Sequence, residues 1–120
     1  MLNLDTHIVI FYAIGAATPR ERALIERSEC AVSGIVLWEI AKLASTGRIE
    51  ADIGSAPLQS LLAALRVVPI SLAIALASTR LDFSADPADE IIAATSIVEH
   101  IPLLTRDRRI LKSRIVPFAV

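Results

Sequence analysis

The sequence is poor in the residues that cross-link a chain covalently. Its single cysteine, Cys30, has no partner for an internal disulfide. It lies in the apolar run Cys30-Ala31-Val32, where we expect a small buried side chain. A chain that does not depend on disulfides fits a cytoplasmic location, which is our expectation here.

Long hydrophobic runs are also missing. The run at 8–17 has ten residues and the run at 67–77 is interrupted by Pro69, whereas a membrane-spanning helix needs about 20 apolar residues. At the N-terminus no charged region precedes an apolar stretch, so we expect no secretory signal. The sequence therefore predicts no contact with a membrane.

The chain lacks a strong net charge, because 12 Lys and Arg residues nearly balance 13 Asp and Glu residues and leave −1. This excludes a general electrostatic attraction to nucleic acid. The segment 106–114 (RDRRILKSR) is locally basic, however, and Arg106, Arg108 and Arg109 are candidate phosphate contacts. The alternative is that these arginines form a solvated helix face.

Aliphatic side chains dominate what is present. Hydrophobic residues make up 54% of the chain and aromatic residues only 4%, with a mean hydropathy of +0.60. Runs of Ile, Leu, Val and Ala are typical of parallel strands that helices bury on both faces. At 120 residues the chain is long enough for one core, so we expect a single domain over 1–120.

Short apolar runs alternate with helical patterns along the chain. Strands are predicted at 2–5, 30–33, 67–70, 102–105 and 116–118. Helices are predicted at 6–13, 19–29, 35–45, 57–65, 71–78, 86–99 and 107–112. This alternation predicts an α/β sandwich with a mainly parallel central sheet.

Four acidic residues follow predicted strands or lie in the first half of predicted helices. Asp5 and Asp107 come after strands, Asp89 lies in a first helical turn, and Glu39 lies about one turn into its helix. Ligands of open parallel sheets bind at the carboxyl ends of the strands, which all four side chains could reach. Because carboxylates repel one another, a shared Mg²⁺ or Mn²⁺ ion is the natural partner.

Such an ion suits phosphodiester hydrolysis, because it polarises a phosphate oxygen and acidifies water. A zinc site is not indicated, since His7 and His100 are isolated; we interpret His7 as a structural or surface residue. Each acid also has a purely structural alternative. Asp5 and Asp107 could cap the helices that follow, Glu39 could pair with Lys42, and Asp89 could interact with the helix dipole.

Four motifs, in the same order and spacing, resemble the PIN-domain ribonucleases of the VapC toxin type. They are MLNLDTH at 1–7, VSGIVLWEIA at 32–41, DPADEIIAAT at 86–95 and LLTRD at 103–107. The resemblance covers essentially the whole chain. It implies a PIN-like three-layer α/β/α sandwich in which Asp5, Glu39, Asp89 and Asp107 are catalytic and hold Mg²⁺ or Mn²⁺.

The resemblance further implies an endoribonuclease that acts as the toxin of a toxin–antitoxin pair. Its partners would be an RNA substrate, a small antitoxin and a second copy in a homodimer. Thr6 or Thr105 would assist through a hydroxyl. Arg106, Arg108 and Arg109 are candidate RNA contacts from their charge alone, with solvated surface as the alternative. Asp86 is either the helix N-cap, which the adjacent Pro87 favours, or a further acid near the metal.

One position departs from the resemblance. Position 90, directly after the third acid, is often Arg in similar toxins and is Glu90 here. This residue either alters metal or phosphate binding or points away at the surface, which we expect. The competing functional hypothesis is a weak or inactive PIN-fold or receiver-like binding module.

Trp38 is predicted to lie in the core.

Overall fold

The computed structural model describes residues 1–47 and 55–119, which contain one four-stranded sheet. Its strands are β1 (Leu2–Leu4), β2 (Cys30–Ser33), β3 (Arg66–Val68) and β4 (Leu103–Leu104). All pairings are parallel, and the order across the sheet is β3-β2-β1-β4. The sheet predicted from the aliphatic runs is confirmed, and β1 is one of its two central strands.

Seven helices lie within the described residues. They are α1 (Thr6–Ala13), α2 (Pro19–Glu26), α3 (Gly34–Ser45), α4 (Ala56–Ala64), α5 (Leu72–Ser78), α6 (Pro87–Glu99) and α7 (Arg108–Leu111). The sequence encodes several of their starts. Thr18 and Glu21 form a reciprocal capping box at α2, and Ser33 accepts a hydrogen bond from the Ile35 amide at α3.

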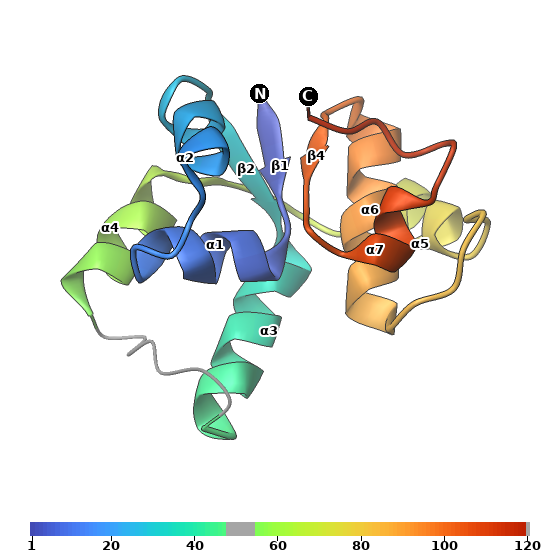
Figure 1. The fold of residues 1–120 in the computed structure, drawn as a ribbon. Coiled ribbons are helices and arrows are strands. Elements are labelled where there is room, and N and C mark those ends of the chain that lie inside the picture. Colours follow the sequence, from blue (N-terminus) through green and yellow to red (C-terminus); the bar gives the residue numbers. More distant parts are fainter. Residues whose placement is uncertain (48–54, 120) are drawn as a thin grey trace.

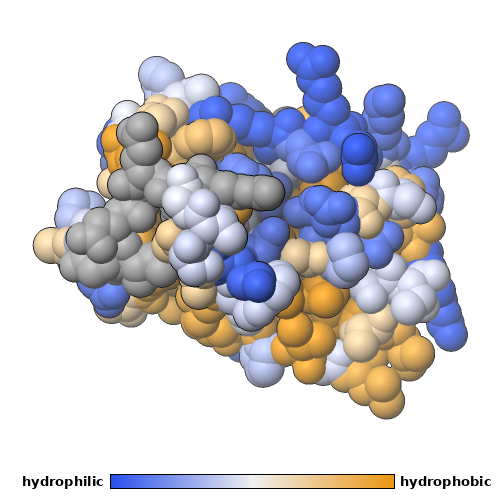
Figure 2. Space-filling view, turned by 90° about the horizontal axis from the view of Figure 1, so that it is seen from below, coloured by the Kyte–Doolittle hydropathy of each residue, from blue (hydrophilic) through white to orange (hydrophobic). Residues whose placement is uncertain are grey.

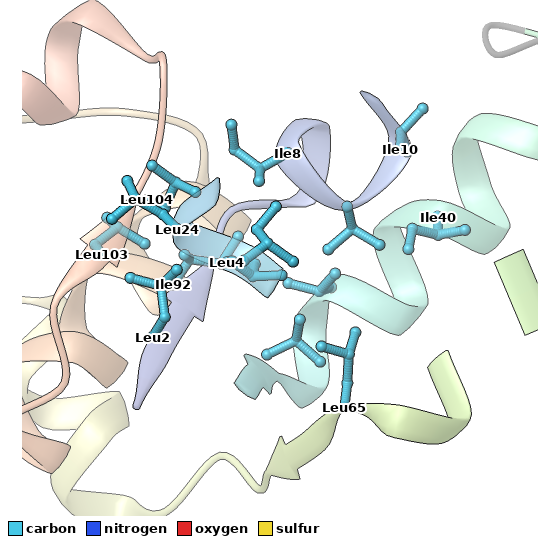
Figure 3. Packing of buried hydrophobic residues seen from close by; sticks show 14 of the residues in the cluster. Leu2, Leu4, Ile8, Ile10, Leu24, Ile40, Leu65, Ile92, Leu103 and Leu104 are labelled. Atoms are coloured by element: carbon cyan, nitrogen blue, oxygen red, sulfur yellow. The ribbon is translucent and has the colours of Figure 1, made fainter. Parts of the chain in front are cut away.

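Helices cover both faces of the sheet (Figure 1). On one face the strands pack against α1 and α4 in a cluster that includes Leu4, Val32, Ile8 and Leu58. On the other face they pack against α5 and α6 in a cluster of Ala31, Val68, Ile74 and Ala94. Figure 3 shows the larger cluster gathered around Leu4 of β1. The predicted three-layer α/β/α sandwich is confirmed.

Four of the five predicted strands are shorter in the structure than in the sequence pattern: 2–5 and 102–105 keep only Leu2–Leu4 and Leu103–Leu104, and two others change more. The segment 116–118 contributes a single bridge between Phe118 and Leu103 and no extended strand. The run 67–70 ends as a strand at Val68, because Ser71 already caps α5 by accepting a hydrogen bond from the Ile74 amide. The predicted helix 19–29 ends at Glu26, before β2.

A buried polar residue fixes helix α6 against strand β1. The Asn3 side chain is fully buried and donates from Nδ2 to the Ile92 carbonyl over 3.2 Å and to Ser96 Oγ over 2.9 Å. Both acceptors lie on α6, whose first turn carries Asp89. The register between β1 and α6 therefore determines how close Asp89 lies to Asp5.

None of the helices in the described part of the chain has the length and apolar character that crossing a bilayer requires.

Candidate functional site

Asp5 is the most deeply buried of the four predicted acids. It follows β1, is 4% exposed and forms the N-cap of α1, so the capping interpretation is confirmed. Its Oδ1 accepts a hydrogen bond from the Thr6 amide over 2.8 Å, and its Oδ2 accepts from the Thr105 hydroxyl over 2.6 Å. Burial raises the pKa of Asp5, and these two hydrogen bonds oppose the rise.

Glu39 is brought to the same edge of the sheet by α3. It is half-buried, and its Oε1 accepts a hydrogen bond of 2.5 Å from the Thr6 hydroxyl. Burial raises the pKa of Glu39, and the negative charge of Asp5 raises it further. Thr6 therefore joins two of the predicted acids, with its amide on Asp5 and its hydroxyl on Glu39.

Asp107 lies two residues after Thr105, at the start of α7. Its amide donates to the Thr105 hydroxyl oxygen over 3.0 Å. Its Oδ1 accepts from the amides of Arg109 over 2.8 Å and Ile110 over 3.2 Å, so Asp107 caps α7. The capping role engages Oδ1, while the negative charge of Asp107 raises the pKa values of both Asp5 and Asp89.

Asp89 shows most clearly that the acids converge. Burial and the surrounding negative charges raise its pKa to about 7. The charges responsible, in decreasing order, are those of Asp5, Glu39, Asp107 and Asp86. Asp5, Glu39, Asp107 and Asp86 thus lie near enough to Asp89 for their charges to act on its carboxyl group. That all four predicted acids share one metal site stays a prediction.

Asp86 occupies the N-cap position of α6, but its side chain makes no capping hydrogen bond to the described first turn. Its charge instead raises the pKa values of Glu39 and Asp89. Glu90 does not line the cavity that Asp5 and Asp107 border, and whether it affects metal or phosphate binding stays a prediction. It is partly buried, and its Oε2 accepts a long hydrogen bond of 3.5 Å from the Ala85 amide, in the loop before α6.

A cavity of about 280 Å³ opens beside this group of acids. Its lining residues are Asp5, His7, Phe11, Arg106 and Asp107. His7 is exposed, as expected for a surface residue, but it lines the site, a role that its isolation in the sequence concealed.

Arg106 is held at the wall of this cavity. Its guanidinium binds the Glu21 carboxylate in bidentate fashion, with Nε–Oε2 and Nη2–Oε1 distances of 2.7 and 2.6 Å. It also lies 4.1 Å from the centre of the Phe11 ring. The hydrogen bond from Arg106 lowers the pKa of Glu21 to about 2. Arg106 is thus strongly engaged within the protein, whereas Arg108 and Arg109 are exposed on α7.

The donor chemistry of the site fits a hard divalent cation. The converging groups are carboxylates, which Mg²⁺ and Mn²⁺ prefer, and their mutual repulsion is what a cation relieves. Across residues 1–47 and 55–119, no three His, Cys, Asp or Glu side chains form a compact metal-binding group.

Comparisons with known proteins agree with this architecture. The family model for the PIN domain matches residues 3–115. Ribonuclease VapC22 from Mycobacterium tuberculosis (strain ATCC 25618 / H37Rv) is 33% identical, in an alignment that covers 92% of this chain and 90% of the relative.

Solved structures with less sequence similarity share the fold. The structure of a toxin–antitoxin complex from Klebsiella pneumoniae matches with a TM-score of 0.73 at 21% identity, covering 99% of this chain and 97% of that chain. VapBC2 from Rickettsia felis, bound to a DNA fragment from its promoter, matches with a TM-score of 0.72 at 18% identity, covering 99% and 98%.

Proposed function

The chain belongs to the PIN-domain family, and from this premise we propose that it is a divalent-metal-dependent endoribonuclease that acts as the toxin of a toxin–antitoxin pair. The observation that carries the proposal is the convergence of Asp5, Glu39 and Asp107 on Asp89, whose pKa rises to about 7. The 33% identity to a ribonuclease over most of both chains supports RNA as the substrate. Membership of this family argues against the receiver-like alternative.

In this proposal Asp5, Glu39, Asp89 and Asp107 hold Mg²⁺ or Mn²⁺. A divalent cation supplies Lewis-acid polarisation of the phosphate and lowers the pKa of water, which together make hydrolysis feasible near neutral pH. The ordinary pKa of Asp is about 3.9, and with a pKa of about 7 roughly half of the Asp89 side chains carry a proton at pH 7, which competes with cation binding.

The residues around the acids position them. Thr105 fixes Asp5 Oδ2, and Thr6 fixes Glu39 Oε1, so neither carboxylate is free to rotate away from the site. Glu21 and Phe11 hold Arg106 at the cavity wall, where its remaining exposed surface could face the RNA backbone. Arg108 and Arg109, on the exposed side of α7, are the more accessible phosphate contacts.

The test is RNA cleavage by the variant Asp5→Asn. This substitution keeps the shape of the side chain and removes its charge, so we expect a folded protein that neither cleaves RNA nor inhibits growth. Glu99→Gln is the matched control, because it removes an exposed carboxylate at the far end of the helix that carries Asp89. Equal cleavage by the two variants would refute the assignment of the site.

We propose two protein partners. The toxin–antitoxin complexes among the structural neighbours support a small antitoxin as one of them. A second copy of the chain is the other, in a homodimer formed through the apolar surface of α5 and the turn before it. That surface exposes Ile70, Leu72 and Leu76, with Leu72 76% exposed. Figure 2 shows hydrophobic residues gathered along one edge of the molecule.

Light scattering tests the homodimer. Leu72→Glu should convert the dimer to a monomer, while Leu111→Glu, at a 48% exposed leucine on α7, should leave the mass unchanged. A monomeric wild-type protein, or a dimer in both variants, contradicts this contact surface. An RNA substrate and a chain without disulfides also fit a cytoplasmic location, which stays a prediction.

A further inference from the structure

The one tryptophan of the chain lies on the surface, beside the proposed catalytic acids. Trp38 is 55% exposed, which corrects the prediction that it lies in the core. The reason is its position on α3: Val36 and Ile40, two residues to either side, point into the core and are at most 2% exposed. Two residues correspond to about 200° around a helix, so Trp38 faces solvent.

The exposed face of α3 around Trp38 combines apolar side chains, Leu37 and Ala41, with the cation of Lys42. The Lys42 ammonium lies 5.7 Å from the centre of the Trp38 ring, and Ser45 is exposed one turn further along. An apolar protein partner covering this face would bury the ammonium without a counter-charge, which is costly. A flat aromatic ring with a cation at its edge is instead the pattern that binds an unpaired base and its phosphate.

This ring is also close to the site. Trp38 precedes Glu39, so their α-carbons are about 3.8 Å apart. The Glu39 carboxylate turns toward Thr6 and the acidic cluster, whereas Trp38 and Lys42 stay on the open side of the same helix. Helix α3 therefore carries a proposed metal ligand and the exposed ring on faces about 100° apart.

We propose that Trp38 and Lys42 form a stacking site for an unpaired base of single-stranded RNA, next to the phosphate that is cut. The inference rests on the proposed ribonuclease function and deepens it by naming what holds the substrate. Trp38 stacks on the base, and Lys42 binds the adjoining phosphate while keeping the ring in place. The site thus favours unpaired RNA over a duplex, whose bases are not available for stacking.

Because Trp38 is the only tryptophan, its fluorescence reports on this site alone. The experiment uses the full chain carrying Asp5→Asn, so that RNA binds without being cut, and titrates it with an unstructured ten-nucleotide RNA of mixed sequence in the presence of Mg²⁺. We expect saturable quenching of the fluorescence. The same RNA, labelled and followed by anisotropy, should bind about fivefold or more weakly to Trp38→Leu, whereas Trp38→Phe should stay within about threefold.

Leu37→Ala is the matched control. It truncates the neighbouring 39% exposed side chain and should leave RNA affinity unchanged. The inference is overturned if RNA binds without quenching and Trp38→Leu binds as tightly as its parent. A second pair of results also overturns the inference: the Trp38 fluorescence changes with protein concentration and not with RNA, and Trp38→Leu alters the mass of the protein in solution. The Trp38 ring then lies between two copies of the chain.

These failures differ from failure of the proposed function. If the wild-type protein cuts RNA but the Trp38 fluorescence does not respond to RNA, only the stacking site is wrong. If the wild-type protein neither cuts nor binds RNA, the ribonuclease proposal fails, and the stacking site fails with it.

Discussion

The Thr105 hydroxyl donates a hydrogen bond of 2.6 Å to Asp5 Oδ2, across 100 residues of sequence. The same hydroxyl oxygen accepts the Asp107 amide over 3.0 Å. Thr105, which is 9% exposed, therefore orients the Asp5 carboxylate and also fixes the start of the turn that carries Asp107. Strands β1 and β4 make this possible, because they pair directly in parallel and end side by side.

Replacing Thr105 by Ala should lower the rate of RNA cleavage by about 10–100-fold, the usual effect of removing a group that orients a metal ligand. Thr105→Ser keeps the hydroxyl and should retain most of the activity. Cleavage rates at saturating RNA measure the effect, and melting temperatures verify that both variants fold. If the Ala and Ser variants are equally active, Thr105 does not orient Asp5 for catalysis.

When no metal is bound, the negative charge of Asp89 should destabilise the folded protein. Its folded-state pKa of about 7 lies above the ordinary value, so the protonated form favours folding. The stability from this protonation is fully present below about pH 4 and is lost as the pH rises through 7. In EDTA at pH 8, Asp89→Asn should therefore melt at a higher temperature than the wild type, and the difference should shrink toward pH 5.

The variant Asp89→Asn should also be inactive on RNA, and added Mn²⁺ should raise the melting temperature of the wild type more than that of the variant. Glu99→Gln supplies the control for loss of one negative charge. A variant less stable than the wild type at pH 8 in EDTA would show that the acids do not repel one another as described.

The Glu21–Arg106 pair gives the opposite pH dependence. Its hydrogen bonds lower the pKa of Glu21 to about 2, so the stabilisation is present above the ordinary value near 4.5 and is lost as the pH falls through 2. At pH 7, Glu21→Gln should lower the free energy of unfolding by about 1.5–3 kcal/mol, because Glu21 is 6% exposed and accepts charged hydrogen bonds.

Urea unfolding at pH 7 and pH 3 measures this effect, which should be smaller at the lower pH. Glu26→Gln, an exposed position on the same helix, should change the unfolding free energy by less than about 0.5 kcal/mol. An equal loss of stability at both pH values would mean that the charge of Glu21 contributes nothing.

The fold and the positions of Asp5 and Asp107 at helix starts were predictable because both depend on local patterns. Aliphatic runs specify buried parallel strands, and Asp5 and Asp107 were recognisable because each follows a strand and precedes a helix. A strand followed directly by a helix places a capping acid at the carboxyl edge of the sheet, so the structural and functional interpretations of these residues coincide. The N-cap position of Asp86 was also predictable from Pro87, although the predicted side-chain bond is absent from the described first turn.

Long-range contacts could not be predicted in the same way. The Glu21–Arg106 bond spans 85 residues, and nothing local shows that this arginine has a buried carboxylate as its partner. Trp38 was predicted to be buried because its neighbours are apolar, but the rotation of α3 directs Val36 and Ile40 inward and Trp38 outward. His7 lines the cavity because α1 begins beside Asp107, which only the assembled sheet determines.

The most direct measurement of the central claim is the anomalous difference map of a crystal grown with Mn²⁺. We expect a manganese peak bonded to Asp5 and to at least one of Glu39, Asp89 and Asp107, and no such peak in crystals of Asp5→Asn. Manganese bound elsewhere, with these four carboxylates left uncoordinated, would contradict it.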